Sequence, residues 1–206
     1  MYLYLMRHGE TDYNRAGLVQ GQIDIPLNAS GCAQSQTAAE YFKTRGIRFG
    51  DVYVSPLSRA WKTAEIVTGR GREAFTTDER LKEMGFGVFE GTPFRNSPGS
   101  FASLVEAPEL YLPPEGGESL DQLKLRCLSF LKEMAKKYED APEDTRVLAA
   151  THGAAIRGFM NIMRREPVSA FWYRGLENCC CVRARLNNGR FIPEAIEHTV
   201  AGATDL

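Results

Sequence analysis

The sequence predicts an α/β fold, a three-layer α/β/α sandwich with a mainly parallel central sheet. Short apolar runs typical of buried strands alternate along the chain with stretches of helical periodicity. The 206 residues suffice for one sizeable core and leave little room for a second. The composition, 43% apolar and 25% charged, is typical of a folded globular chain. We therefore expect a single domain over residues 1–206.

The first half of the chain predicts two successive units of strand, loop and helix. The apolar run at residues 2–6 predicts a buried strand, and a segment rich in Gly and Asn follows it. A helix is expected over 30–45, closed by Gly46. Residues 51–55 then predict a short second strand, and the helical spacing over 58–69 predicts the helix that follows it.

The middle of the chain, residues 79–118, carries scattered Gly and Pro and predicts irregular structure with at most one short helix. Loops of this length are usually functional. We expect part of this segment, residues 84–118, to form a loop and helix excursion over the functional site.

The last third predicts a long helix, a third buried strand, another helix and a terminal hairpin. Ser119 and Gln122 form a capping box at the start of the long helix, which runs to Tyr138. The strand is expected at 146–150 and the next helix at 154–163. The hairpin pairs 179–186 with 191–196 around Asn187-Asn188-Gly189.

Charge and apolar patterning exclude several kinds of partner. The formal net charge of −1 argues against nucleic acid or an anionic membrane bound through bulk charge. No run approaches the roughly 18 apolar residues of a membrane span, and the first ten residues lack the features of a signal peptide. We therefore expect a cytoplasmic protein with no membrane partner.

The five cysteines are an odd number without CxxC spacing, which fits neither a disulfide framework nor a zinc site. We interpret them as reduced, small apolar side chains. In the strand predicted at 179–186, alternation sends Cys179 and Cys181 to one face of the sheet and Cys180 to the other.

Basic and imidazole side chains follow the predicted strands where each strand ends. Arg7 and His8 follow the first, Arg59 comes shortly after the second, and His152 follows the third. Ligands of open α/β sheets bind beyond the carboxyl ends of the strands. The four side chains are therefore expected to converge on one edge of the sheet.

Two guanidinium groups and two imidazoles around one point favour a dianionic phosphoryl group, because arginine grips phosphate oxygens bidentately. A neutral imidazole nitrogen can attack phosphorus when a hydrogen bond fixes the proton on the other nitrogen. Such a reaction requires no metal and no cofactor. A carboxylic acid near the leaving oxygen would complete the site, and the candidates are Glu10, Glu83 and Glu90.

Six blocks in order along nearly the whole chain resemble the histidine phosphatase superfamily, in its phosphoglycerate mutase-like branch and small-phosphatase type. They are LMRHGETDYN (5–14), QGQIDIPLNASGCAQ (20–34), SPLSRAWKTAEI (55–66), LKEMGFGVFEG (81–91), PEGGES (114–119) and THG (151–153). RHG alone is a weak signal, whereas the six blocks together are highly specific.

The resemblance implies a role for each matching residue. His8 is the nucleophile that becomes phosphohistidine, and Glu83 is the general acid that protonates the leaving alcohol and then activates water. The remaining matches bind phosphoryl oxygens or line the pocket: Arg7, Asn14, Gln20, Gly21, Arg59, His152 and Gly153. Glu10 is interpreted as structural, and Glu90 as a residue at the surface or behind the site.

The resemblance implies a phosphomonoesterase acting on a small phosphorylated metabolite, and it leaves two alternatives. A cofactor-dependent phosphoglycerate mutase is disfavoured because only 68 residues lie between Glu83 and His152, and because Phe86 stands where mutases usually carry a Tyr. A non-catalytic phosphate-binding module usually lacks one of the essential residues, all of which are present here. Substrates within the resemblance include α-ribazole 5′-phosphate, sugar phosphates, phosphoglycerate and aryl phosphates. The chain is expected to be a monomer or a homodimer.

The segment 94–111 suggests an apolar wall beside the phosphate, although core packing explains its side chains equally well. Its apolar members are Phe94, Phe101, Leu104, Leu110 and Tyr111. Arg95 and Arg126 are candidates for contact with a second anionic group of the substrate, and solvation at the surface is the alternative for both.

Overall fold

A six-stranded sheet forms the centre of the computed structural model, which describes residues 1–94, 100–172 and 175–200. The strand order is β3-β2-β4-β1-β5-β6. The first four strands in that order run parallel, and β5 and β6 form an antiparallel edge. The strands are β1 (Tyr2–Arg7), β2 (Val52–Val54), β3 (Thr76–Thr77), β4 (Arg146–Thr151), β5 (Cys181–Asn187) and β6 (Arg190–Glu197).

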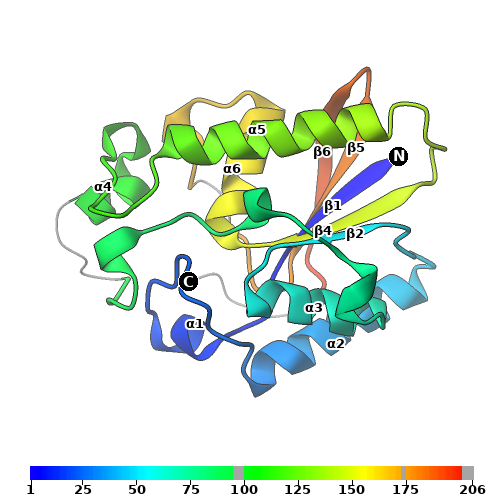
Figure 1. Ribbon diagram of the computed structural model, residues 1–206, viewed down its shortest axis with the longest axis horizontal. Helices are drawn as coiled ribbons and strands as arrows, with labels where there is room; N and C mark the ends of the chain where they lie inside the picture. The colour runs from blue at the N-terminus through cyan, green and yellow to red at the C-terminus, as the bar shows by residue number, and fades with distance from the viewer. Residues whose placement is uncertain (95–99, 173–174, 201–206) are drawn as a thin grey trace.

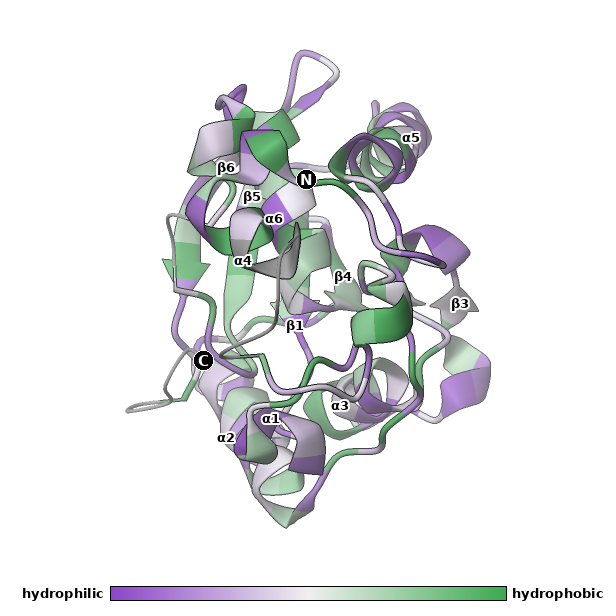
Figure 2. Ribbon diagram, turned by 90° about the vertical axis from the view of Figure 1, so that its left-hand side faces the viewer, coloured by the Kyte–Doolittle hydropathy of each residue, from purple (hydrophilic) through white to green (hydrophobic). Residues whose placement is uncertain are grey.

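Helices cover both faces of the sheet, as Figure 1 shows. On one face lie α2 (Ala29–Thr44) and α3 (Ser58–Thr68), and on the other lie α5 (Leu120–Lys137) and α6 (Gly153–Arg164). Each face has its own cluster of buried apolar side chains, and the helices that cover the sheet carry both hydrophobic and hydrophilic residues, as the colours of Figure 2 show. The predicted three-layer α/β/α sandwich with a mainly parallel sheet is therefore confirmed.

The pairing of β1 with β4 determines where the polar strand ends meet. The two strands run parallel in a register that places Arg7 opposite Thr151, the last residues of both. The chain therefore leaves the sheet at neighbouring points, at His8 and at His152. Because β2 pairs with the other edge of β4, the start of α3 reaches the same side of the sheet.

Local sequence signals explain several element boundaries. The side chain of Ser119 accepts a hydrogen bond from the backbone N–H of Gln122, and the Gln122 side chain accepts one from the N–H of Ser119, so the predicted capping box begins α5. Asn188 and Gly189 have φ angles of 48° and 71°, the left-handed pair that a tight hairpin between β5 and β6 requires.

The triple cysteine is divided between the two faces of the sheet as predicted, although β5 begins only at Cys181 and Cys179 has a left-handed φ of 62°. Cys180 belongs to the apolar cluster on the face of α5 and α6, whereas Cys179 and Cys181 belong to the cluster on the face of α2 and α3. All three thiols are buried and free. The other two cysteines are also free; Cys127 is buried and Cys32 is half-buried.

Two short elements were not predicted. The helix α1 (Asp12–Ala16) is five residues long, and its capping box joins Thr11 to Asn14. The strand β3 has two residues. Elements this short show no usable periodicity, so hydrophobic patterning cannot reveal them.

In its described residues, 79–94 and 100–118, the middle segment contains one short α-helix, as predicted, together with single turns of 3₁₀ helix. The helix is α4 (Ser100–Glu106), and the turns are η2 (Glu79–Leu81), η3 (Gly87–Phe89) and η4 (Pro108–Leu110). Two further turns are η1 (Arg72–Ala74) and η5 (Val168–Ala170). Within the described ranges, no helix has the length and apolar character needed to cross a membrane.

Candidate active site

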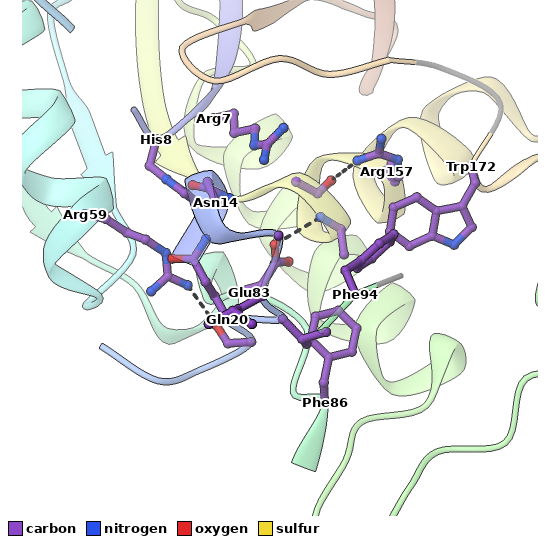
Figure 3. Close-up of a pocket in the computed structure, with 16 residues that line it drawn as sticks. Arg7, His8, Asn14, Gln20, Arg59, Glu83, Phe86, Phe94, Arg157 and Trp172 are labelled. Carbon is purple, nitrogen blue, oxygen red and sulfur yellow. Dashed lines mark hydrogen bonds between the residues drawn. The ribbon is translucent and has the colours of Figure 1, made fainter. Parts of the chain in front are cut away.

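A pocket opens beyond the carboxyl ends of β1 and β4 (Figure 3). Its lining contains eight of the residues predicted for the site: Arg7, His8, Asn14, Gln20, Gly21, Arg59, Glu83 and Gly153. The ninth, His152, is fully buried directly behind the lining, and its ring centroid lies 5.2 Å from that of His8. The structure thus brings all nine residues to one place.

The backbone fixes the tautomer of His8. Its Nδ1 lies 2.7 Å from the carbonyl oxygen of Gly9, which can only accept a hydrogen bond, so Nδ1 carries the proton. The Nε2 atom therefore keeps its lone pair. The main chain of His8 is held as well, because its N–H donates to Thr151 O at 3.1 Å and its carbonyl accepts from Asn178 Nδ2 at 3.0 Å.

Both histidines are neutral at pH 7. Burial lowers the pKa of His8 well below its usual value, and the positive charges of Arg59 and Arg7 lower it further. Burial, followed by Arg59, lowers the pKa of His152 in the same way. His152 Nε2 lies 2.8 Å from Ser55 Oγ, whereas the buried Nδ1 has no hydrogen-bond partner among the residues that the structure describes.

Arg59 lies in the first turn of α3 and is 1% exposed. Its Nη2 donates to Gly21 O at 2.7 Å and its Nη1 to Ile23 O at 2.8 Å, so the guanidinium holds the loop that lines the pocket. Burial lowers the pKa of Arg59 to about 10, and the group stays protonated at pH 7. Arg7 Nη1 donates to Leu176 O.

Gly21 is required where the loop 20–23 passes the site. Its φ is +50°, and a Cβ on this residue would lie 2.0 Å from Glu90 Oε1. That carboxylate oxygen accepts hydrogen bonds from the backbone N–H of Gln22 at 2.9 Å and of Phe86 at 3.0 Å. Glu90 therefore joins two loops and is outside the pocket lining.

The amides of Asn14 and Gln20 turn their oxygens away from the pocket. Asn14 Oδ1 accepts from the backbone N–H of Thr11 at 3.2 Å, and Gln20 Oε1 accepts from the Thr11 hydroxyl at 2.8 Å. Because each amide oxygen is engaged with protein, the amino groups of both side chains remain as donors for an anion in the pocket.

Glu83 places its carboxyl group at the N-terminus of α6. Its Oε1 accepts from the N–H of Met84 at 2.8 Å and of Ala155 at 3.0 Å, and its Oε2 accepts from Ala154 N–H at 3.2 Å. The side chain is 9% exposed and lines the pocket. Glu10, the third candidate carboxylate, instead accepts from Asn28 Nδ2 at 2.7 Å and is outside the lining.

Arg126 of α5 holds the loop that carries Glu83, and all five of its N–H groups are used. Two donate to Glu118, from Nε at 2.7 Å and from Nη2 at 2.9 Å. The other three donate to loop carbonyl oxygens, those of Arg80 at 2.8 Å, Lys82 at 2.7 Å and Glu83 at 3.1 Å. Arg126 is therefore neither a solvated surface residue nor a contact for a second anion, and its role is to anchor this loop.

The sequence model of the histidine phosphatase superfamily (branch 1) matches residues 3–199. The chain belongs to this superfamily. The family that the six sequence blocks predict is confirmed, and the enzyme class is that of a histidine phosphatase, as predicted.

Relatives of this histidine phosphatase carry several functional names. A fructose-2,6-bisphosphatase from Danio rerio is 34% identical over 96% of this chain and 74% of its own length. A probable phosphoglycerate mutase from Proteus mirabilis is 33% identical over 93% of this chain and 88% of its own. The crystal structure of a phosphoserine phosphatase from Entamoeba histolytica with 3-phosphoglyceric acid superposes with a TM-score of 0.81, at 26% identity, over 95% of this chain and 96% of that one.

The pocket also contains residues that the sequence did not single out, of which Arg157, Trp172 and Leu18 are examples. Arg157 had a signal, since it is a charged residue within a stretch of α6 whose neighbours are all buried. The positions of Trp172 and Leu18 depend on loop packing and have no such signal.

The proposed apolar wall is only partly present. Phe94 lines the pocket of the phosphatase, and Phe86 joins it from the preceding loop. Leu104 and Tyr111 are instead buried in the main apolar cluster, and Leu110 is 70% exposed. The alternative explanation, core packing, therefore holds for Leu104 and Tyr111. Arg95 and the side chain of Phe101 lie outside the described part of the chain.

Proposed function

We propose that this histidine phosphatase hydrolyses a small phosphomonoester through a phosphohistidine on His8, with Glu83 as general acid and base. Arg7, Arg59 and His152 bind the phosphoryl oxygens in this proposal. Further donors come from the amino groups of Asn14 and Gln20, from the loop at Gly21 and from the backbone N–H of Gly153 at the start of α6.

The observation that carries the proposal is the state of His8. A neutral imidazole whose Nδ1 proton is held by the Gly9 carbonyl presents a lone pair on Nε2. The buried guanidiniums of Arg7 and Arg59 line the same pocket. Burial, together with their positive charges, keeps the imidazole neutral. The two guanidiniums would also stabilise the charge that spreads over the phosphoryl oxygens in the transition state.

In the first step, Nε2 of His8 attacks phosphorus and forms the P–N bond while the ester P–O bond breaks. The protonated carboxyl of Glu83 gives its proton to the leaving oxygen, so the product leaves as a neutral alcohol. In the second step, the Glu83 carboxylate takes a proton from water and the resulting hydroxide attacks phosphorus. The P–N bond breaks, its electron pair returns to Nε2, and phosphate is released.

The substrate we propose is a small phosphorylated metabolite. The relatives are named for fructose 2,6-bisphosphate and phosphoserine, and one holds 3-phosphoglyceric acid. The pocket combines basic and amide groups near His8 with the aromatic side chains of Phe86, Phe94 and Trp172, which would contact the carbon skeleton of the ester. Residues 84–118 contribute Phe86 and Phe94 to that wall, in support of a role as a cover over the site.

Phosphoglycerate mutase activity is the second candidate, because a relative at 33% identity is named a probable mutase. The two reactions share the phosphohistidine and differ in what accepts the phosphoryl group. A mutase passes it to a second hydroxyl of the bound glycerate, whereas a phosphatase passes it to water. Measuring phosphate release together with conversion of 3- to 2-phosphoglycerate separates them.

The proposal is tested by trapping the intermediate. The enzyme is quenched with denaturant during turnover of a ³²P-labelled phosphomonoester, and we expect acid-labile label on the peptide that contains His8. Turnover without such an adduct contradicts the two-step mechanism. Binding of phosphate with neither turnover nor adduct indicates a non-catalytic phosphate-binding module instead.

A further inference from the structure

The imidazole of His152 is held by a serine that the proposed reaction does not use. His152 Nε2 lies 2.8 Å from Ser55 Oγ, and both residues are fully buried. Ser55 directly follows β2, and its backbone N–H donates to Ala150 O at 3.0 Å, in the strand that leads to His152. The pairing of β2 with β4 therefore fixes the hydroxyl beside the imidazole.

The surroundings of Ser55 decide the direction of this hydrogen bond. A hydroxyl can donate to an imidazole nitrogen or accept from it. Ser55 Oγ already accepts from the backbone N–H of Leu57 at 3.3 Å. Within the described ranges, the hydroxyl hydrogen of Ser55 has no acceptor other than His152 Nε2. A buried hydroxyl hydrogen without an acceptor is unfavourable, so Ser55 donates and Nε2 accepts.

This direction determines which nitrogen of His152 carries the proton. The imidazole is neutral, because burial and then the positive charge of Arg59 lower its pKa, and a neutral imidazole has a single N–H. The lone pair of Nε2 accepts from Ser55, so the proton is on Nδ1. Because Nδ1 is buried and has no partner in the described part of the chain, His152 holds an unused donor.

The unused donor lies close to the nucleophile. The ring centroids of His8 and His152 are 5.2 Å apart. A phosphoryl oxygen is the acceptor that the proposed reaction brings next to the His152 ring, and its negative charge strengthens a hydrogen bond from Nδ1. With the proton on Nε2 instead, Nδ1 would present a lone pair, which repels an oxyanion. The tautomer therefore decides whether His152 can bind the phosphoryl group.

The two histidines carry the proton on the same nitrogen, and opposite contacts keep it there. In His8, the carbonyl of Gly9 accepts from Nδ1 and leaves the lone pair of Nε2 for attack. In His152, the hydroxyl of Ser55 occupies the lone pair of Nε2 and leaves the hydrogen of Nδ1 for an anion. One ring is thus prepared as a nucleophile and the other as a donor.

We propose that Ser55 is a positioning residue that fixes the tautomer of His152, so that Nδ1–H donates to an oxygen of the transferred phosphoryl group. The inference rests on the proposed phosphatase function and adds how His152 is prepared for its contact. Ser55 lies outside the pocket lining and acts only through His152.

Nitrogen NMR reads the tautomer directly. The chain has three histidines, so ¹⁵N-labelled histidine gives three side-chain patterns in a long-range ¹H–¹⁵N correlation spectrum. His152→Leu assigns one pattern to His152 by its disappearance. We expect a protonated Nδ1 and an unprotonated Nε2 for His152 in the wild-type enzyme. In Ser55→Ala, nothing selects between the nitrogens, and the pattern should become that of a mixture of tautomers.

Two further variants control the NMR experiment. Ser55→Thr keeps the hydroxyl and should keep the wild-type pattern of His152. Ser35→Ala removes another fully buried hydroxyl, one that donates to Gly31 O at 2.8 Å, and should also leave the pattern of His152 unchanged. A pattern that changed in Ser35→Ala as much as in Ser55→Ala would contradict a specific role of Ser55.

The consequence for anion binding is measured with inorganic phosphate by calorimetry. Loss of a donor to a charged oxygen predicts a Kd about 10-fold higher in Ser55→Ala, and Ser55→Thr should restore most of the affinity. Because Ser55 acts through His152, Ser55→Ala should cause no further loss of affinity in the His152→Leu background. A purely structural role of Ser55 would give the same loss in both backgrounds.

A proton on Nε2 of His152 in the wild-type enzyme overturns the inference, as does an unchanged pattern in Ser55→Ala. An equal loss of phosphate affinity in both backgrounds also overturns it. Failure of the proposed function is a distinct result, namely no hydrolysis of phosphomonoesters. The nitrogen pattern and the phosphate affinity need no turnover, so they test the role of Ser55 in that case too.

Discussion

The two sides of the pocket are built by different means. His8 and His152 leave the sheet side by side, because β1 and β4 are paired in parallel and end at the same level. Glu83 comes from an irregular loop that lies outside the strands and α-helices. Its position depends on side chains, above all on the five hydrogen bonds donated by Arg126.

The difference shows which parts of a site the topology secures. Backbone pairing of β1 with β4 over six residues holds the strand-end side of the pocket, which carries His8 and His152. Replacing one side chain there should remove a catalytic group without moving the others. On the loop side of the pocket, which carries Glu83, a replacement can also displace the catalytic group, because a few polar contacts hold the loop. Replacements on the two sides should therefore differ in kind as well as in size.

The largest effect is expected at His8. His8→Ala removes the nucleophile, and turnover should fall by at least about 10⁴-fold because no other group can form the covalent intermediate. Steady-state phosphate release measures the loss, and thermal unfolding should show a fold that is still intact. Residual turnover within tenfold of wild type would show that another group attacks phosphorus.

Glu83→Gln removes the proposed proton donor of the loop side. A well-placed general acid contributes about 10²- to 10⁴-fold, so kcat should fall by that amount while binding of phosphate or vanadate remains close to wild type. Substrates with activated leaving groups, such as aryl phosphates, need no protonation and should lose less. An equal loss on alkyl and aryl esters would contradict the role of Glu83 as proton donor.

Arg126→Met removes the side chain that holds the loop of Glu83 in position. Removing the guanidinium leaves Glu118, 16% exposed at its side chain, without its partner and three loop carbonyls without their donor. We expect a loss of about 2–4 kcal/mol in the free energy of unfolding, measured in urea, and a fall of about 10- to 100-fold in kcat with less change in KM.

Lys132→Met is the matched control for Arg126→Met, since it removes an exposed cation from the same helix, and it should change neither quantity. Glu118→Gln should show part of the Arg126 effect on both. A stability loss in Arg126→Met without any fall in kcat would mean that the loop keeps Glu83 in place by other contacts, such as the hydrogen bond from Gln22 Nε2 to Glu83 O.

The same division explains what could be predicted from sequence. The strand-end residues follow from local rules, because each strand is visible as an apolar run and ligands of α/β sheets bind beyond the strand ends. That logic brings His8 and His152 together from residues alone. Glu83 was one of three carboxylates until the resemblance selected it, and nothing local distinguishes it from Glu90.

Arg126 and Arg157 show the limit of such rules. Their partners lie 8 to 46 residues away for Arg126 and in a separate loop for Arg157. Helical periodicity gives the face of α5 or α6 on which each one lies, but not the loop that packs there. The sequence alone therefore left Arg126 between two wrong alternatives and did not single out Arg157.

The dependence of stability on pH should also come from the strand-end side. His8 and His152 have pKa values lowered by burial and by nearby arginines, whereas histidine in the unfolded chain titrates near pH 6.5. The unfolded chain therefore binds more protons below pH 6.5. Stability is complete above that pH and falls as the pH drops toward the lowered pKa values of the folded state.

Between pH 6.5 and 5.5, the two histidines together should cost about 2 kcal/mol in the free energy of unfolding. Urea unfolding at the two pH values measures it. His152→Asn should remove about half of this difference, because one of the two buried imidazoles no longer titrates. Arg126→Met should be less stable at both pH values with the difference unchanged, because Arg126 is charged at both: burial acts to lower its pKa, but its hydrogen bond and ion pair with Glu118 raise it. An Arg126 variant that flattened the dependence would show that the two sides of the pocket are coupled.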